Sequence, residues 1–177
     1  VEEEVHTETL NLSGESTTFT FTPEEAGEYL VRVDAQDGAG RIARSEVSFY
    51  ATGSEWVRWG SDNPQAIQLV PDREVYSVGD TAQLMVQSPL PRGEYLVTTE
   101  RDGIMSSDLI TLEGSANSIE IPITDEHVPV VYVAIATSQE RQEPPSSYFE
   151  PDLGKPKGYF GIVRLEVDAE PRSLDVA

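Results

Sequence analysis

The strongest constraint on this chain is the alternation of apolar and polar residues with a period of two. Almost every apolar stretch alternates in this way, and most end at Gly, Pro, Asp or Asn. Such alternation is typical of strands that bury one face, whereas an amphipathic helix repeats its apolar residues every three or four positions. No stretch of the sequence requires a long helix. We therefore expect an all-β protein built from antiparallel strands.

The strand signals fall into two groups. Residues 1–53 resemble a meander that is too short for a sandwich with two covered faces. Residues 66–170 carry strands at a spacing of about 8 to 12 residues, which predicts a complete, seven-stranded Ig-like β-sandwich after the partial β-sandwich domain. We expect the N-terminal strands at Thr7–Asn11, Thr17–Thr22, Gly27–Asp34 and Arg41–Tyr50. We expect the C-terminal strands at Ile67–Val70, Thr81–Gln87, Glu94–Arg101, Asp108–Leu112, Ser118–Thr124, Val130–Thr137 and Tyr159–Asp168.

Two local signals refine this arrangement. Asp37-Gly38-Ala39-Gly40 predicts a tight reversal, because Asp and Gly tolerate the positive φ angles of hairpin turns. Pro122 falls inside a predicted strand, where it cannot donate a ladder hydrogen bond. We therefore expect that strand to lie near the margin of its sheet.

Residues 54–65 separate the two groups, and we interpret them as an interdomain linker because they are rich in Gly, Ser, Asp and Asn. Two indole rings, Trp56 and Trp59, are unusual in a freely moving linker, and we expect them to join the two domains by burying apolar area. Residues 171–177 resemble the start of a truncated further domain. The chain begins at Val1 without an initiator Met or an apolar leader, so we expect an excised soluble piece of a longer protein, with any targeting signal or anchor elsewhere in that protein.

The composition disfavours several functions. The chain has 32 acidic and 12 basic residues, and its formal net charge is −20. Such a charge repels nucleic-acid phosphates and anionic lipid headgroups, so we expect neither nucleic-acid binding nor direct membrane contact. The chain has no Cys, and it therefore offers no disulfide, thiolate nucleophile or sulfur-ligated metal site.

Candidate catalytic and metal-binding residues are few. His6 and His127 lie far apart without a second His or a Cys nearby, so we predict surface positions for both and neither a triad nor a zinc site. The acidic residues that could supply oxygen ligands to Ca²⁺ are Asp34, Asp37, Asp125 and Glu126. Their spacing matches no calcium-loop signature, and turn formation accounts for the aspartates. We predict a chain that is not an enzyme and carries no cofactor.

The connection from Ser138 to Gly158 is long for a hairpin loop and is rich in Pro and acidic residues. Long loops are usually functional or disordered, and proteolytic nicking concentrates at loop tips. We predict an exposed, protease-accessible or partner-contacting loop. Its candidate residues are Arg141, Tyr148, Phe149, Lys155 and Lys157. The alternative is that Tyr148 and Phe149 cap the sandwich locally while the prolines protect adjacent bonds.

A Tyr-x-x-Gly-Asp element is formed by Tyr76, Gly79 and Asp80. A large aromatic ring can close the end of a sandwich, and Gly-Asp can form the turn into the next strand. The element is followed in order by Thr-Glu-Arg-Asp-Gly at 99–103 and by Val-Pro-x-Val-Tyr-Val at 128–133.

This ordered combination resembles the macroglobulin-type domain that carries or adjoins the bait region in bacterial α2-macroglobulin-like proteins. The stretches that carry the resemblance are LVPDREVYSVGDTAQLMVQSP, YLVTTERDGI, SIEIPITDEHVPVVYVAIA and GYFGIVRLEVD. The N-terminal stretches PEEAGEYLVRVDAQDGAGR and SFYATG are similar to the closing half of the preceding macroglobulin-type domain. The resemblance covers nearly the whole chain, and it explains why residues 1–53 fall short of a domain.

The resemblance implies a non-catalytic structural module of a broad-range protease inhibitor, which offers a cleavable bait, changes conformation when cut and entraps the protease. In many members a thioester between Cys and Gln in a separate domain then attaches the protease, and a chain without Cys cannot hold that bond. The bait can lie in the long loop or beyond Ala177.

The expected partners are neighbouring domains and, through the longer protein, proteases. The expected location is the periplasm, the cell envelope or the extracellular space, with or without a membrane anchor elsewhere in the protein. The alternative function is an Ig-like adhesion or carbohydrate-binding module that uses exposed aromatic residues such as Trp56 and Trp59.

Overall fold

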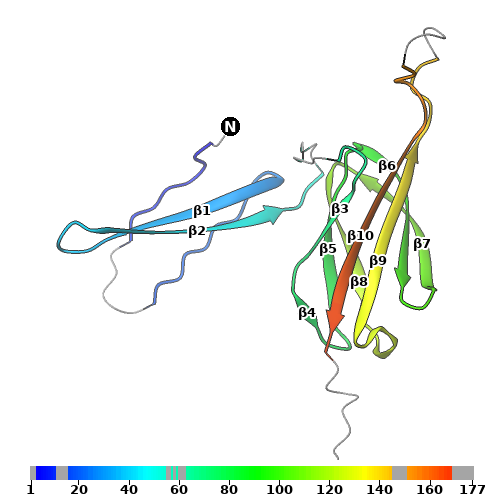
Figure 1. Ribbon diagram of the computed structural model, residues 1–177. Coiled ribbons are helices and arrows are strands. Elements are labelled where there is room, and N and C mark those ends of the chain that lie inside the picture. The colour runs from blue at the N-terminus through cyan, green and yellow to red at the C-terminus, as the bar shows by residue number, and fades with distance from the viewer. Residues whose placement is uncertain are drawn as a thin grey trace, which may run out of the picture.

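The computed structural model describes residues 3–10, 16–54, 57, 59, 63–144 and 151–168. Within these residues the chain is all-β, as predicted, and their helical content is limited to the 3₁₀ turn η1 (Asp125–His127). A long hairpin formed by β1 and β2 projects away from a sandwich formed by β3 to β10 (Figure 1). The chain is therefore an Ig-like, mostly antiparallel β-sandwich preceded by a smaller β unit.

The strands match the predicted alternation closely in the sandwich. The hairpin consists of β1 (Gly27–Gln36) and β2 (Ile42–Ala51). The sandwich consists of β3 (Gln68–Pro71), β4 (Val75–Tyr76), β5 (Thr81–Gln87), β6 (Arg92–Glu100), β7 (Ile104–Glu113), β8 (Ala116–Pro122), β9 (Val130–Gln139) and β10 (Lys157–Val167). Every predicted strand of the sandwich is present, with ends shifted by a few residues. The short β4 was not predicted, because two residues cannot display an alternation.

Two sheets pack face to face in the sandwich. The wide sheet has the order β4-β10-β9-β6-β7, and the narrow sheet has the order β3-β5-β8. Neighbouring strands are antiparallel except for the parallel pair of β4 and β10. The largest fully buried side chains of the core include Tyr76, Leu84, Tyr95, Ile135 and Leu165. Each large apolar side chain stabilises the fold by about 1.5 to 3 kcal/mol relative to an exposed position.

The segment that enters the sandwich joins both sheets. Ala66 forms a parallel bridge with Phe160, and Ile67 donates its N–H to the carbonyl oxygen of Phe160 at 2.9 Å, so the chain first pairs with β10 of the wide sheet. The chain then pairs with β5 of the narrow sheet from Gln68 onward. The crossing brings the backbones so close that a Cβ at Gly161 would overlap the Ile67 carbonyl group. A glycine is therefore required at this position of β10.

The predicted marginal position of the strand with Pro122 is confirmed. β8 lies at an edge of the narrow sheet and ends at Pro122. The proline thus stands where a missing backbone donor costs least, because an edge strand needs a partner on one side alone.

The Tyr-x-x-Gly-Asp element closes one end of the sandwich as expected. Tyr76 is 1% exposed, and its hydroxyl group donates a hydrogen bond to Oδ1 of Asp72 at 2.8 Å. Gly79 has a φ of +96°, a value that side-chain-bearing residues rarely adopt. Asp80 accepts the backbone N–H of Ser77 through Oδ2 at 3.0 Å and so fixes the turn into β5.

The predicted reversal at Asp37 is also confirmed. Oδ1 of Asp37 accepts the backbone N–H groups of Ala39 and Arg41, each at 2.9 Å, and Gly40 adopts a φ of +81°. The hairpin then pairs without interruption from Gln36 opposite Ile42 to the base of both strands.

The two N-terminal strand predictions are wrong. Residues 7–10 and 16–22 form no strand, and Asn11 lies outside the described residues. Phe19 and Phe21 nevertheless lie on one side, where both contact the ring of His6 at centroid distances of 5.5 and 5.7 Å. Phe21 also meets the ring of Tyr29 at 5.9 Å. The alternation is thus satisfied by aromatic contacts, without the backbone pairing that defines a strand, and the expected meander is reduced to one hairpin.

The prediction of a surface position holds for His6 and is wrong for His127. His6 has a side chain that is 46% exposed, whereas His127 is 7% exposed. Nδ1 of His127 accepts the backbone N–H of Thr124 at 3.2 Å and closes η1. Burial, then the positive charge of Arg101, hold the pKa of His127 below its ordinary value, so the ring is neutral at pH 7. A lone histidine gives no sequence pattern that distinguishes such a cap from a surface residue.

Candidate functional site

The junction between the hairpin and the sandwich is the first candidate functional region. Trp59 lies edge-on against Tyr50 of β2, with ring centroids 5.9 Å apart. Its indole N–H donates to the carbonyl oxygen of Ser115 at 2.5 Å, and Ser115 directly precedes β8. Trp59 therefore contacts a strand of the hairpin and a turn of the sandwich at the same time. Trp56 lies outside the described residues.

Ser115 is the centre of this junction, and it is completely buried. Its hydroxyl group accepts the N–H of Val57 at 2.6 Å and donates to the carbonyl oxygen of Val57 at 2.8 Å. The neighbouring carbonyl of Ala116 accepts the N–H of Gly53 at 3.0 Å. The segment after β2 is thus bonded to the β7–β8 turn at several points. We call Gly53, Ser54, Val57, Trp59 and the turn residues Gly114, Ser115 and Ala116 the connector node.

Gly114 makes the connector node possible. Its φ is +85°, and a Cβ at this position would overlap the backbone carbonyl of Ser54. Its N–H donates to the carbonyl oxygen of Pro91 at 2.7 Å, which anchors the turn to the start of β6. The residue thus has both a conformational and a steric reason to be glycine. No contact was expected for this stretch from the sequence.

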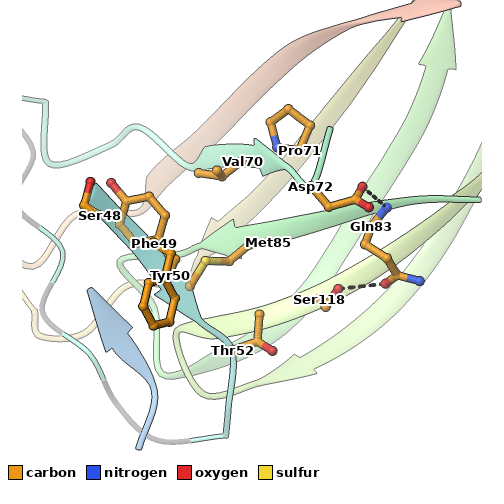
Figure 2. Close-up of a pocket in the computed structure, with 10 residues that line it drawn as sticks. All are labelled: Ser48, Phe49, Tyr50, Thr52, Val70, Pro71, Asp72, Gln83, Met85 and Ser118. Atoms are coloured by element: carbon orange, nitrogen blue, oxygen red, sulfur yellow. Dashed lines mark hydrogen bonds between the residues drawn. The ribbon is translucent and has the colours of Figure 1, made fainter. Parts of the chain in front are cut away.

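A cleft of about 630 Å³ lies beside the junction. Figure 2 shows Phe49 and Tyr50 of β2 opposite Val70 and Met85 of the narrow sheet. The remaining lining residues are Ser48, Thr52, Pro71, Asp72, Gln83 and Ser118. The cleft thus has an apolar wall on each side and a polar edge along the sandwich.

The polar edge of the cleft is held by a hydrogen-bond network. The backbone N–H of Gln83 donates to Asp72 at 2.9 Å, and the side-chain oxygen of Gln83 accepts from Ser118 at 3.1 Å (Figure 2). Burial alone would raise the pKa of Asp72, but the hydrogen bonds from Gln83 and Tyr76 outweigh it and hold the pKa below its ordinary value. Asp72 is therefore an ionised, fixed acceptor at neutral pH.

The base of the long β9–β10 loop is the second candidate region. Arg141 forms a two-pronged pair with Asp152, with Nη1–Oδ1 and Nη2–Oδ2 distances of 2.9 Å. The N–H of Gln142 donates to the carbonyl oxygen of Gly154 at 3.0 Å, which continues the pairing beyond the ends of the strands. The hydrogen bond from Arg141 holds the pKa of Asp152 below its ordinary value. The two sides of the loop base are thus fixed to each other.

The other predicted loop residues have different positions. Lys155 is exposed and lowers the pKa of Asp152 further, whereas Lys157 is exposed at the first position of β10, opposite Gln139. Tyr148 and Phe149 lie outside the described residues. Sequence reasoning missed Asp152 as the partner of Arg141, because the two lie 11 residues apart in the sequence and no local pattern connects them.

Reactive chemistry is sparse in the part of the chain that the structure describes. No group of three or more His, Asp or Glu side chains there could hold a metal ion. Asp34 is paired with Arg44, and Asp37 with Arg41, each at 2.7 Å. Among the described residues, no helix is long and apolar enough to cross a bilayer.

Comparison with known proteins adds an independent observation. Residues 67–177 match the model of the family described as the alpha-2-macroglobulin bait region domain. The chain is 28% identical over 109 residues to an alpha-2-macroglobulin homolog of Nostoc sp., with 62% of this chain and 6% of that protein covered. It is 32% identical over 109 residues to an alpha-2-macroglobulin homolog of Deinococcus radiodurans, with 59% of this chain and 10% of that protein covered.

A third relative is alpha-2-macroglobulin of Ralstonia nicotianae, which is 33% identical over 98 residues. The matched region spans 6 to 10% of the length of these three relatives. No solved structure is significantly similar to the chain.

Proposed function

Because the chain belongs to the alpha-2-macroglobulin bait region domain family, we propose that it serves as a non-catalytic structural module of a broad-range protease inhibitor. It is a module of an alpha-2-macroglobulin-like protein, and its matched region is a small part of the relatives. The bait, the conformational change and the entrapment of the protease would be properties of the longer protein. This chain would contribute fixed surfaces to that mechanism.

The connector node is the structural observation that supports this role. A protein that responds to a cut in its bait must transmit the change from one domain to the next. Ser115 bonds both polar groups of the Val57 backbone and accepts the indole N–H of Trp59. The hairpin unit and the sandwich would therefore move as one body, and motion would be transmitted across the junction.

The β9–β10 loop is the proposed contact with proteases or neighbouring domains. β9 and β10 extend beyond the body of the sandwich toward this loop (Figure 1). The bonds at Arg141 fix its base, so the loop would be presented at a defined place. Its candidate residues remain Arg141, Tyr148, Phe149, Lys155 and Lys157.

The proposed partners are neighbouring domains and, through the longer protein, proteases. The net charge of −20 supports the absence of nucleic-acid and direct membrane contacts from this role, because like charges repel. The proposed location is the periplasm, the cell envelope or the extracellular space, where such an inhibitor would meet foreign proteases.

Limited proteolysis of the full-length protein tests the proposed inhibition. The uncut and cut forms would be compared by small-angle X-ray scattering, and the protease would be assayed on a small peptide and on a large protein substrate. We expect compaction after the cut, with peptide cleavage retained and protein cleavage lost because the protease is enclosed. A cut protein that neither changes shape nor holds the protease would show that the chain has another role.

The cleft supports one alternative, an adhesion or carbohydrate-binding module. Phe49 and Tyr50 face the polar edge formed by Asp72 and Gln83, and such combinations can bind sugar rings. A glycan array probed with the 177-residue chain alone tests this function. Specific binding that is abolished by Tyr50→Ala would favour the alternative, and the inhibitor role predicts that the chain alone binds no glycan.

A further inference from the structure

The outer face of the wide sheet carries an apolar strip that no described part of the chain covers. The strand register places Leu109, Leu96, Ala136 and Phe160 in one straight row across β7, β6, β9 and β10. The adjacent row contains Ser107, Thr98, Ala134 and Ile162. We call these two rows the outer strip. Paired residues of neighbouring strands point to the same face, so the outer strip is continuous.

The large side chains of the outer strip are widely exposed. Leu109 is 67% exposed, Phe160 54%, Ile162 53% and Leu96 45%, and Tyr132 of the next row is 38% exposed. Contiguous apolar patches of this kind are uncommon on soluble proteins and usually mark an interaction site. In the middle of the strip, Ala134 and Thr98 keep the surface flat, and they are themselves buried at 4% and 7% exposure. The strip therefore offers a flat floor flanked by large apolar side chains.

Acidic side chains border the outer strip. Along β6 the residues of this face are Arg92, Glu94, Leu96, Thr98 and Glu100, so a carboxylate stands on each side of Leu96 and Thr98. On β10 the guanidinium group of Arg164 is paired with Glu166 at 3.3 Å. The carboxylates of Glu94, Glu100 and Glu166 thus outnumber the basic groups of Arg92 and Arg164 around the apolar centre, and a charged border around a dry core is typical of interfaces.

We propose that the outer strip is the docking surface for a neighbouring domain of the same longer protein, one that presents an apolar centre surrounded by basic side chains. The acidic rim selects a basic partner, since opposite charges steer and orient a contact. A second copy of this chain is a poor partner, because two chains of net charge −20 repel each other. The inference rests on the proposed function, because the partner domain would belong to the same inhibitor. In the relatives, most of the protein lies outside the matched region, so further domains are present there.

Hydroxyl-radical footprinting of the 177-residue chain and of the full-length protein tests the proposal. We expect Leu96, Leu109 and Phe160 to be oxidised several-fold more slowly in the full-length protein. Leu84, which is 0% exposed, provides the lowest oxidation rate as a reference in both proteins. Equal oxidation of the strip in the two proteins would overturn the proposal, even if the full-length protein traps proteases normally.

Variants of the full-length protein provide the second measurement. Leu109→Glu with Phe160→Glu should restore oxidation of Leu96 to the rate in the isolated chain, whereas Glu120→Lys on the narrow sheet should change nothing. Glu94→Lys with Glu100→Lys should have the same effect as the first pair, because the rim would then repel a basic partner. Protection that appears in the isolated chain and rises with its concentration would identify a second copy as the occupant, and protection on addition of a glycan would identify a sugar; either result overturns the proposal.

Discussion

The hydroxyl group of Tyr76 connects three parts of one end of the sandwich. It donates to Asp72 and accepts the N–H of Arg73 at 3.2 Å, while Asp72 also accepts the N–H of Gln83 in β5. Burial, together with the hydrogen bond to Asp72, raises the pKa of Tyr76 to about 12. The neutral hydroxyl form is therefore built into the folded state.

Replacement of Tyr76 by Phe should lower the free energy of unfolding by about 2 kcal/mol, because a hydrogen bond to a charged carboxylate is lost. Urea denaturation at pH 7 measures the change, and Tyr132→Phe on the exposed outer face serves as the matched control, with a change of about 0.5 kcal/mol or less. In the wild type the raised pKa of Tyr76 contributes to the free energy of unfolding. This contribution is fully present below pH 10 and is lost as the pH rises toward 12. An equal loss in both variants would contradict this account.

His127 predicts a dependence of stability on acidic pH. Its pKa lies below the ordinary value of 6.5 because of burial, so this ring binds a proton more strongly in the unfolded chain than in the folded protein. Its contribution is complete above pH 6.5 and is lost as the pH falls toward the folded pKa. His127→Asn keeps an acceptor for the N–H of Thr124 and removes the titration. We expect the stability of the wild type relative to this variant to fall between pH 7 and pH 5, as measured by thermal unfolding; a constant difference would show that the ring does not titrate in this way.

At the scale of elements, the alternation of apolar and polar residues explains why the strands form. The residues at the strand ends decide how the connecting loops are held. β9 and β10 continue into a loop whose base is closed by Arg141 and Asp152. The peptide bond after Arg141 includes the N–H of Gln142, and that N–H donates a hydrogen bond to the carbonyl oxygen of Gly154. A protease must open this pairing before it can bind the segment, so the base should resist cleavage.

Asp152→Asn should increase the rate of tryptic cleavage after Arg141 a few-fold, because the charged pair that fixes the base is lost. Mass spectrometry of the fragments locates the cut, and Asp108→Asn on β7 is the control with an unchanged rate. Identical rates in wild type and Asp152→Asn would mean that the pair does not limit access to this bond.

At the scale of the whole molecule, the connector node decides how the two units are joined. Ser115 lies 58 residues from Val57 and 56 residues from Trp59 in the sequence, yet it bonds to both. The bonds between the segment after β2 and the β7–β8 turn link the hairpin to the sandwich. The relative orientation of the two units should therefore depend on this turn.

Ser115→Ala removes both hydrogen bonds to Val57, and Gly114→Val forces the carbonyl of Ser54 away. Both variants should broaden the distribution of distances between spin labels attached through Ala43→Cys and Asp108→Cys, which is practical because the chain has no native Cys. Electron double resonance measures the distribution, and Ser106→Ala at the other end of β7 is the control. Distances that stay narrow in both variants would show that other contacts hold the units together.

The sequence by itself determined the strands of the sandwich, the turns at Asp37 and Gly79 and the family resemblance, because alternation and turn chemistry are written within a few neighbouring residues. It also identified the indole rings and the long loop as unusual. Only the tertiary structure decided that residues 16–22 form no strand, that His127 is buried, that Asp152 meets Arg141 and that Ser115 bonds to Trp59. Each of these depends on which distant segments come together, and burial and pairing across such distances leave no local periodicity in the chain.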